Sequence, residues 1–158
     1  MSEKTNAARL LDIAGIDYKL SSYNTDDGAI DGKSVAKKLG LSEDEIFKTL
    51  VASGASSSVY VFVIPVSSEL DLKKAAKASG EKYIEMLPLK DLFKVTGYVK
   101  GGCSPLGMKK HFPTFFDETL ILLDTVVFNA GKVGFQLHVP TTELTKVIDY
   151  KLADLVTG

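Results

Sequence analysis

The sequence predicts an α/β (α+β) protein in which helices surround a mostly antiparallel or mixed, barrel-like sheet. The length of 158 residues suits one domain, spanning residues 1–158, and 45% of the residues are apolar, as in ordinary globular proteins. Helical and strand-like segments are interspersed rather than strictly alternating. Several strand-like segments are separated by short turns, which favours hairpin-connected strands.

The first half of the chain contains short amphipathic segments, each followed by a glycine that can end a helix. The expected helices cover residues 6–14, 34–39 and 72–78. The expected strands cover residues 18–23, 48–53 and 59–66, the last two joined as a hairpin. Residues 24–32 form a loop, and Ser42 with Glu45 three positions later fits a capping box.

The second half is richer in strand-like segments. A helix is expected over residues 88–94, entered through Pro88 at its first turn, and another over 141–148 with Thr142 as its cap. The expected strands cover residues 115–116, 120–123, 126–129 and 134–139. Residues 97–105 form an irregular glycine-containing loop, and residues 151–156 a last helical or irregular segment.

Charge and cysteine content restrict the classes of function. The net charge of −1 gives no support to general nucleic-acid binding, so any contact with RNA needs a local group of lysines. The single cysteine excludes an intrachain disulfide and agrees with a cytoplasmic location. Residues 1–6 lack the apolar run of a signal peptide, and the longest apolar stretch, 59–66, is too short to span a bilayer. We expect no membrane or DNA partner.

The common catalytic sets are not evident in the sequence. Two histidines, His111 and His138, and one cysteine, Cys103, cannot supply the four ligands of a structural zinc site. A Cys–His pair is conceivable, but Cys103 is more simply read as a small buried apolar residue. No phosphate-binding glycine motif of the nucleotide-binding classes is present.

Three segments could nevertheless carry chemistry, and each has an ordinary alternative. Residues 97–110 combine adjacent glycines with flanking lysines, which suits an anion-binding turn or a simple tight turn. Lys48 begins an apolar strand, where it either meets an anion in a pocket or is solvated. Residues 129–136 form either a turn that faces a ligand or a plain hairpin turn. Residue patterns by themselves leave these alternatives open.

Together these segments resemble the YbaK/prolyl-tRNA-synthetase editing-domain family. The matching elements run in order over nearly the whole chain: Tyr23 before an Asp-Gly loop, Val35 to Leu41, Phe47-Lys48-Thr49-Leu50, Leu70 to Lys74, and Gly97 to Lys110. The resemblance implies a fold of helices around a barrel-like sheet, and no metal or organic cofactor is expected from it. It also implies an enzyme that clears wrongly attached amino acids from tRNA, with Cys-tRNA(Pro) as the substrate of the YbaK branch, acting in trans or beside prolyl-tRNA synthetase.

The resemblance also assigns roles to individual positions. Lys48 matches the key lysine of the family, and Gly101, Gly102, Ser104 and Pro105 match the loop that faces the aminoacyl ester. The expected pocket positions are Tyr23, Thr49, Asn129, Gly134 and Gln136. Gln136 departs from the family, because the YbaK branch often carries an aspartate there. The lysines expected to contact the tRNA acceptor end are Lys73, Lys74, Lys77, Lys100, Lys109 and Lys110.

A mechanistic hypothesis follows from these assignments. The Lys48 ammonium would hold the phosphate or ribose of the terminal adenosine, or the developing oxyanion, and the N–H groups around Gly101 and Gly102 would form part of an oxyanion site. The nucleophile would be the thiol of the substrate cysteine or a positioned water. The competing readings are an editing enzyme for alanine, a non-catalytic module that retains the pocket, and a thiol enzyme using Cys103.

Overall fold

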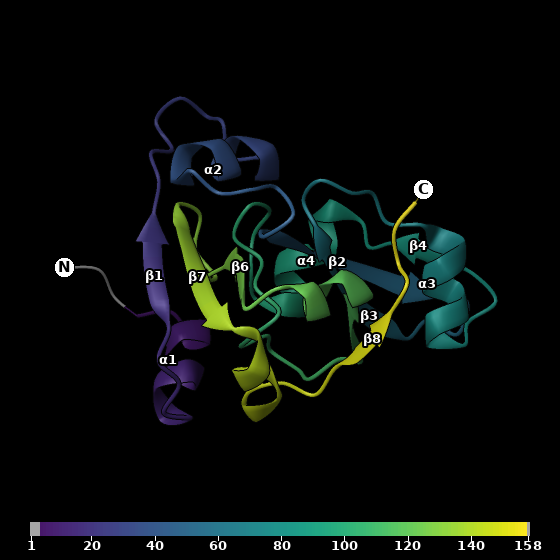
Figure 1. The fold of residues 1–158 in the computed structure, drawn as a ribbon. Coiled ribbons are helices and arrows are strands. Elements are labelled where there is room, and N and C mark those ends of the chain that lie inside the picture. Colours follow the sequence, from purple (N-terminus) through teal and green to yellow (C-terminus); the bar gives the residue numbers. More distant parts are fainter. Residues whose placement is uncertain (1–3, 158) are drawn as a thin grey trace.

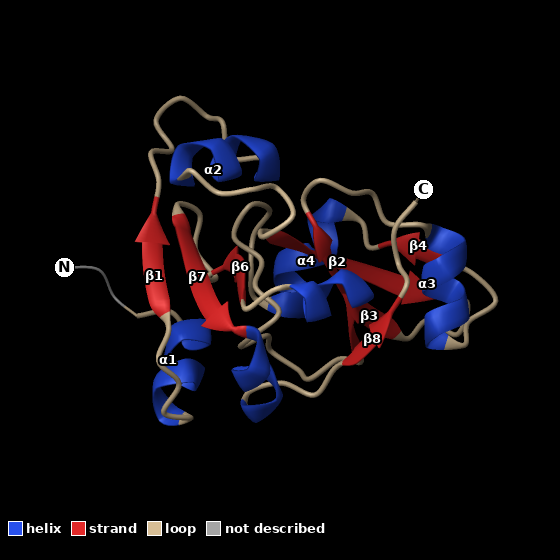
Figure 2. Cartoon of the chain, in the orientation of Figure 1, coloured by secondary structure: helices blue, strands red, loops and turns tan. Residues whose placement is uncertain are grey.

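The computed structural model describes residues 4–157, in which helices and 3-10 turns surround two β-sheets (Figures 1 and 2). Residues 1–3 and 158 lie outside the described part, so the expectation for the N-terminal segment is tested only from residue 4 onward. The two sheets lie side by side. The mixed α/β class expected from the sequence is confirmed.

The smaller sheet has three antiparallel strands in the order β1-β7-β6. Its strands are β1 (Lys19–Ser22), β6 (Thr125–Asn129) and β7 (Phe135–Pro140). Helix α1 (Asn6–Ile13) packs against this sheet, with Leu11 fully buried beside Phe128 of β6. The same core continues to Phe116 and Val61 of the second sheet, so the two sheets share one apolar interior.

The larger sheet has five strands in the order β4-β2-β3-β5-β8 and is mixed. Its strands are β2 (Phe47–Gly54), β3 (Val59–Pro65), β4 (Ile84–Met86), β5 (Thr114–Asp117) and β8 (Lys151–Ala153). β2 and β3 form the expected antiparallel hairpin, whereas β5 and β8 add in parallel. Helix α3 (Leu72–Ser79) covers one face through Ala75 and Ala76, which pack with Phe62 and Ile64.

The sheets do not close into a barrel, which corrects that part of the expectation. They are joined by one parallel bridge between Ile46 and Val127, where the Val127 N–H donates to the Glu45 carbonyl at 3.0 Å. On the same edge of β2, strand β4 pairs only with residues 52–54. Residues 47–51 therefore have no hydrogen-bonded strand on that side, and the interrupted hydrogen bonding leaves an opening in the wall.

The remaining helices follow the capping signals of the sequence. Helix α2 (Gly32–Leu39) begins earlier than expected because the Asp31 carboxylate caps it, accepting from the Ser34 N–H at 3.2 Å. Helix α4 (Leu89–Thr96) starts after Pro88 and ends at Gly97, whose φ of +87° suits glycine. The Ser42–Glu45 segment keeps half of a capping box, since Glu45 accepts from the Ser42 N–H, but a turn follows rather than a helix.

Several element predictions in the second half are wrong. Residues 120–123 are not a strand but belong largely to the 3-10 helix η1 (Glu118–Leu122), because the Asp117 side chain caps its start. Residues 141–148 form a shorter 3-10 helix, η2 (Thr141–Lys146), with Pro140 rather than Thr142 at the cap position. Residues 151–153 are strand β8, and β4 was not expected at all. Both short strands depend on distant partners that local patterns do not reveal.

Candidate functional site

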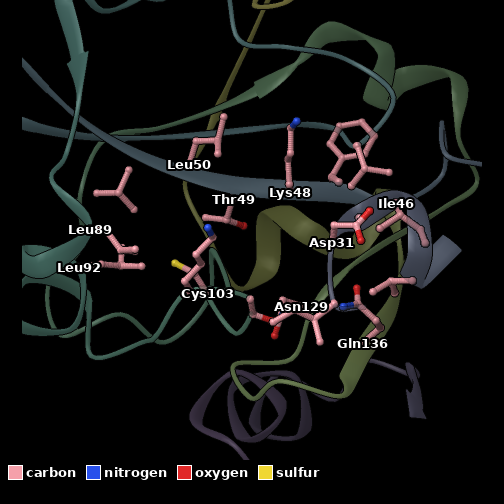
Figure 3. Close-up of a pocket in the computed structure, with 18 of the residues that line it drawn as sticks. Asp31, Ile46, Lys48, Thr49, Leu50, Leu89, Leu92, Cys103, Asn129 and Gln136 are labelled. Carbon is pink, nitrogen blue, oxygen red and sulfur yellow. The ribbon is translucent and has the colours of Figure 1, made fainter. Parts of the chain in front are cut away.

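A cleft of about 740 Å³ opens at the bare edge of β2, between the two sheets and α4 (Figure 3). This volume lies in the range of small-molecule sites. Five segments that are distant in the sequence line it: residues 28–32, residues 46–51, helix α4 with the residues before it, residues 100–103, and the β6–β7 pair. Lys48 and Gly101, which the sequence places 53 positions apart, line the same cleft.

The backbone of β2 itself forms part of the cleft wall. The Val51 carbonyl faces the β4 side, where it accepts from the Leu87 N–H at 3.0 Å. Because N–H and C=O groups alternate in direction along a strand, Thr49 points its own pair of backbone groups to the same side. No strand covers Thr49 there, so one donor and one acceptor of the main chain are presented to the cleft.

Lys48 and Thr49 leave the strand on opposite faces, as alternation predicts. Figure 3 shows the Lys48 side chain on the same side as Leu50 and the Thr49 side chain directed toward Cys103. Both residues line the cleft because it wraps around the bare strand edge. Lys48 is half-buried and makes no ion pair within residues 4–157, so its charge is available to a ligand.

Gly101 lies where two loops meet over the cleft. Its φ is +82°, and a Cβ at this position would lie 2.9 Å from Ile30 Cδ1, so only glycine fits without strain. The Asn129 side chain donates from Nδ2 to the Gly101 carbonyl at 2.5 Å and accepts from the Gly131 N–H at 3.0 Å. Asn129 therefore ties the glycine loop to the β6–β7 turn, which restricts where the Gly101 N–H can point.

Three buried polar side-chain atoms in residues 4–157 have no hydrogen-bond partner: Tyr23 OH, Thr49 Oγ1 and Gln136 Oε1. Such atoms are rare in folded proteins and call for an explanation. Thr49 and Gln136 line the cleft, and Gln136 shares a face with Asn129 because the two are directly opposite across β6 and β7. Tyr23 does not line the cleft but packs against the apolar cluster that includes Val35 and Ile46.

The loop before α2 forms one rim of the cleft and is fastened by Lys38. The Lys38 ammonium donates to the Asn24 carbonyl at 2.6 Å, the Asp27 carboxylate at 2.8 Å and the Ala29 carbonyl at 2.8 Å. It also lies 5.8 Å from the centre of the Tyr23 ring. Sequence reasoning missed Lys38 and the rim residue Ile30. Asp31, three positions before Ser34, was the available signal that a helix starts here.

The titratable groups near the cleft do not form a nucleophile–base pair. Burial raises the pKa of the Cys103 thiol to about 12, so it stays protonated near neutral pH. The pKa of His138 is lowered by burial and by the nearby Lys19, and its Nε2 lies 2.6 Å from Ser21 Oγ. His138 does not line the cleft, and His111 lines a separate small pocket. The structure thus argues against the thiol-enzyme reading.

Several residues expected at the site lie elsewhere. The Gly102 N–H donates to the Val99 carbonyl at 3.0 Å and so is not free to bind an oxyanion. Of the two N–H groups expected in the oxyanion site, only that of Gly101 remains. Ser104 is fully buried, and its hydroxyl accepts from the Leu106 N–H. Pro105 lines the separate small pocket. Gly134 does not line the cleft, but its carbonyl accepts from the Tyr23 N–H at 2.9 Å and so positions that residue.

The expected tRNA-contact lysines separate into two groups. Lys73, Lys74 and Lys77 belong to α3, which contributes nothing to the cleft, and Lys74 is paired with Asp154 at 3.1 Å. By contrast, Lys100 lines the cleft and Lys109 lies against α4. Lys110 is exposed and lines the small pocket beside His111.

Among residues 4–157, no three His, Cys, Asp or Glu side chains gather in a way that could hold a metal ion. The helices in this range are all too short or too polar to cross a membrane.

Comparison with known proteins finds consistent matches. The family model described as "Aminoacyl-tRNA editing domain" matches residues 29–147. A protein of Enterococcus faecalis named "Putative Cys-tRNA(Pro)/Cys-tRNA(Cys) deacylase EbsC" is 42% identical over 155 residues, which are 98% of this chain and 94% of that protein. The crystal structure of "a putative trans-editing enzyme for prolyl tRNA synthetase" superposes with a TM-score of 0.85 at 25% identity, covering 99% of this chain and 100% of that one. A hypothetical protein at 22% identity shares the fold, with a TM-score of 0.84 over 97% of this chain and 100% of its own.

Proposed function

Since this chain belongs to the aminoacyl-tRNA editing domain family, as its sequence resemblance predicted, we propose that it hydrolyses the ester of mischarged tRNA(Pro), with Cys-tRNA(Pro) as its main substrate. The substrate is the one named first for the Enterococcus faecalis relative. The proposal includes action in trans in the cytoplasm, alone or beside prolyl-tRNA synthetase, by one domain spanning residues 1–158. It also includes catalysis without a metal or organic cofactor.

The observation that supports this function best is the convergence of Lys48 and Gly101 on one cleft whose other polar groups lack partners. An aminoacyl ester carries an α-ammonium group, a carbonyl, a ribose and a phosphate. The unpartnered Gln136 Oε1 and the Thr49 carbonyl are acceptors that suit the ammonium group. Gly101 N–H donates to no atom of residues 4–157 and suits the carbonyl oxygen as it becomes negative.

The position of Lys48 favours contact with the terminal adenosine over stabilisation of the oxyanion. Its side chain leaves β2 on the face opposite to Thr49, which points toward the glycine loop. A substrate carbonyl at Gly101 would therefore lie on the other side of the strand edge. We assign the Lys48 ammonium to the phosphate or ribose of the terminal adenosine, where it anchors the nucleotide while the ester sits beside Gly101.

The cleft supplies binding and charge stabilisation rather than a nucleophile. Cys103 is kept protonated by burial, which raises its pKa to about 12. With a cysteinyl ester, the substrate thiol attacks its own carbonyl carbon: a C–S bond forms, the C–O ester bond breaks, and the thiol proton passes to the released ribose oxygen. An aminoacyl ester is already activated, so positioning can account for much of the rate.

A deacylation panel tests the proposal. The substrates are Cys-, Ala- and Pro-tRNA(Pro), together with Cys-tRNA(Cys), and the proteins are the wild type, Lys48→Ala and the matched control Lys73→Ala on α3. We expect Cys-tRNA(Pro) to be cleaved fastest. Loss of a charge-assisted contact in Lys48→Ala should lower kcat/KM roughly 10- to 100-fold, with Lys73→Ala unchanged.

Each arm of the panel has a decisive outcome. Full activity of Lys48→Ala would remove that residue from the site. Preferred cleavage of Ala-tRNA(Pro) would replace the cysteine assignment by the alanine one. Tight binding of an aminoacyl-adenosine analogue without turnover of any substrate would identify a non-catalytic module.

A further inference from the structure

Helix α4 presents an exposed aromatic ring beside the cleft. Phe93 is 58% exposed, whereas the other phenylalanines of residues 4–157 are buried or half-buried. Leu89, one turn earlier on the same helix, is 60% exposed and lines the cleft rim. Residues four apart on a helix are surface neighbours, so an apolar strip runs from the cleft rim to the Phe93 ring.

The surroundings of this strip are basic although the chain as a whole is weakly acidic. Residues 89–111 contain five lysines, at positions 90, 94, 100, 109 and 110, and a single carboxylate, Asp91. Lys90 and Lys94 lie on α4, Lys109 contacts that helix, and Lys100 lines the cleft itself. This is the local group of cations that contact with RNA requires in a protein of net charge −1.

Lys109 connects the basic groups to the aromatic ring. Its backbone N–H donates to the Thr96 carbonyl at 3.1 Å, which fastens the segment to the end of α4. Its ammonium lies 5.2 Å from the centre of the Phe93 ring and 3.4 Å from the Lys94 carbonyl. A cation is thus held next to a ring that remains more than half exposed.

We propose that this face of α4 is a stacking platform for the unpaired 3′ end of the tRNA, with a base on Phe93 and the phosphates near Lys94, Lys100 and Lys109. The inference rests on the proposed function and extends it to the nucleotides that precede the terminal adenosine. Stacking on an aromatic ring inside a basic groove is the usual way in which proteins hold single-stranded nucleic acid. An apolar protein partner would fit the ring but not the lysines on α4 and Lys109 beside it.

The first test compares two substrates of different length. Phe93→Ala should lower kcat/KM for Cys-tRNA(Pro) roughly 5- to 100-fold, mainly through KM, because a stacked base is lost. The same variant should cleave cysteinyl-adenosine, which lacks the preceding nucleotides, as fast as the wild type. Phe93→Tyr should keep the activity on tRNA and Phe93→Leu should not, because only tyrosine keeps the π-face.

The second test works even if no ester is cleaved. The chain contains no tryptophan, so Phe93→Trp introduces a single fluorescent reporter on α4. Uncharged tRNA(Pro) ending in unpaired CCA should quench this tryptophan, and the same tRNA lacking the last three nucleotides should not. Leu122→Trp on η1, where the native side chain is 78% exposed and outside the cleft, is the matched control and should not respond.

Several results would overturn the platform. Equal loss on both substrates would mean that Phe93→Ala disturbs the cleft, and no loss on either would mean that the ring is not used. Equal quenching by intact and truncated tRNA would place the duplex, not the single strand, on α4. Unchanged turnover of tRNA with lost binding to prolyl-tRNA synthetase would make this face a protein interface. Failure of the wild type on every ester would reject the proposed function, while quenching by CCA-ending RNA would still support the platform.

Discussion

Two buried polar side chains, Asp117 in the larger sheet and Gln136 in the smaller one, differ in whether the fold supplies hydrogen-bond partners for their oxygens. Asp117, at the end of β5, is fully buried, and its carboxylate accepts from the Leu155 N–H at 3.0 Å and from the Thr119 N–H and hydroxyl at 3.2 and 2.6 Å. Gln136, on β7, is 4% exposed, yet its Oε1 has no partner. The fold satisfies the first residue, whereas the second has no partner, as we propose for a residue that binds the substrate.

The difference extends to the segments around each residue. Near Asp117, strand β5 pairs with β8, and the carboxylate holds the segment after β8 through the Leu155 N–H. The contacts of that carboxylate therefore support folding. Near Gln136, the edge of β2 is bare and Thr49 Oγ1 also lacks a partner. An unpartnered buried polar atom costs free energy, so its retention at a cleft indicates use in binding.

The largest effect on activity is expected from a substitution in the glycine loop, which tests whether the cleft around Gln136 serves catalysis. Gly101→Ala puts a side chain at a φ of +82° and its Cβ 2.9 Å from Ile30 Cδ1, so we expect the strained turn to relax and turn its N–H away from the ester. We expect a loss of roughly 100-fold in kcat for Cys-tRNA(Pro), as for loss of an oxyanion donor. Left-handed backbone should also cost about 1–2 kcal/mol of stability. The measurements are single-turnover deacylation and urea unfolding.

The control for Gly101 is another glycine with similar backbone geometry. Gly80 ends α3, away from the cleft, and has a φ of +76°. A Cβ added there by Gly80→Ala would have no atom within 4 Å. It should lose comparable stability with no loss of activity per folded molecule. Equal activity losses in the two variants would remove Gly101 from the catalytic proposal.

The two buried polar residues themselves should give opposite results. Gln136→Leu removes an unpartnered acceptor, so stability should stay equal or rise, while kcat/KM falls roughly 10-fold through the lost ammonium contact. Asp117→Ala leaves the Leu155 N–H without its acceptor and should cost about 1–3 kcal/mol with activity unchanged. Urea unfolding measures the change in stability of each variant, and deacylation of Cys-tRNA(Pro) measures its change in kcat/KM. A destabilised but fully active Gln136→Leu would reverse the assignment.

The smallest expected effect concerns Cys103. Its folded pKa of about 12 lies above the ordinary value of 9, so between these pH values the unfolded chain has lost a proton that the folded chain keeps. Stability should therefore fall as pH rises above 9, by at most about 1.4 kcal/mol per pH unit from this group. Urea unfolding at pH 8 and 10 should show a smaller drop for Cys103→Ala than for the wild type, with deacylation at pH 7.5 unchanged. An identical drop in both would show that the thiol is not protected.

The lysines illustrate what a pattern of charges can and cannot predict. Both α3 and α4 carry lysines at similar spacing, and the sequence gives no sign that one helix faces a cleft. Lys74 is held by Asp154 and the Val156 carbonyl, two partners some 80 positions later in the chain. Lys48 and Gly101 were predicted as site residues because their motifs resemble a family, not because their residue types are unusual.

Local signals determined much of the secondary structure by themselves. Asp71 at the start of α3, Pro88 before α4 and the glycines that end these helices act through neighbouring backbone groups, so the sequence alone was enough to place α1 to α4 closely. The resemblance of its motifs to the editing-domain family likewise predicted the class of reaction from the sequence alone. Only the tertiary structure decided that the sheets stay open at residues 47–51, that β8 pairs with β5, and that Lys48 and Thr49 approach the same cleft from opposite faces. These features depend on contacts between distant segments, and whether a buried polar atom finds a partner is settled only once those segments have packed.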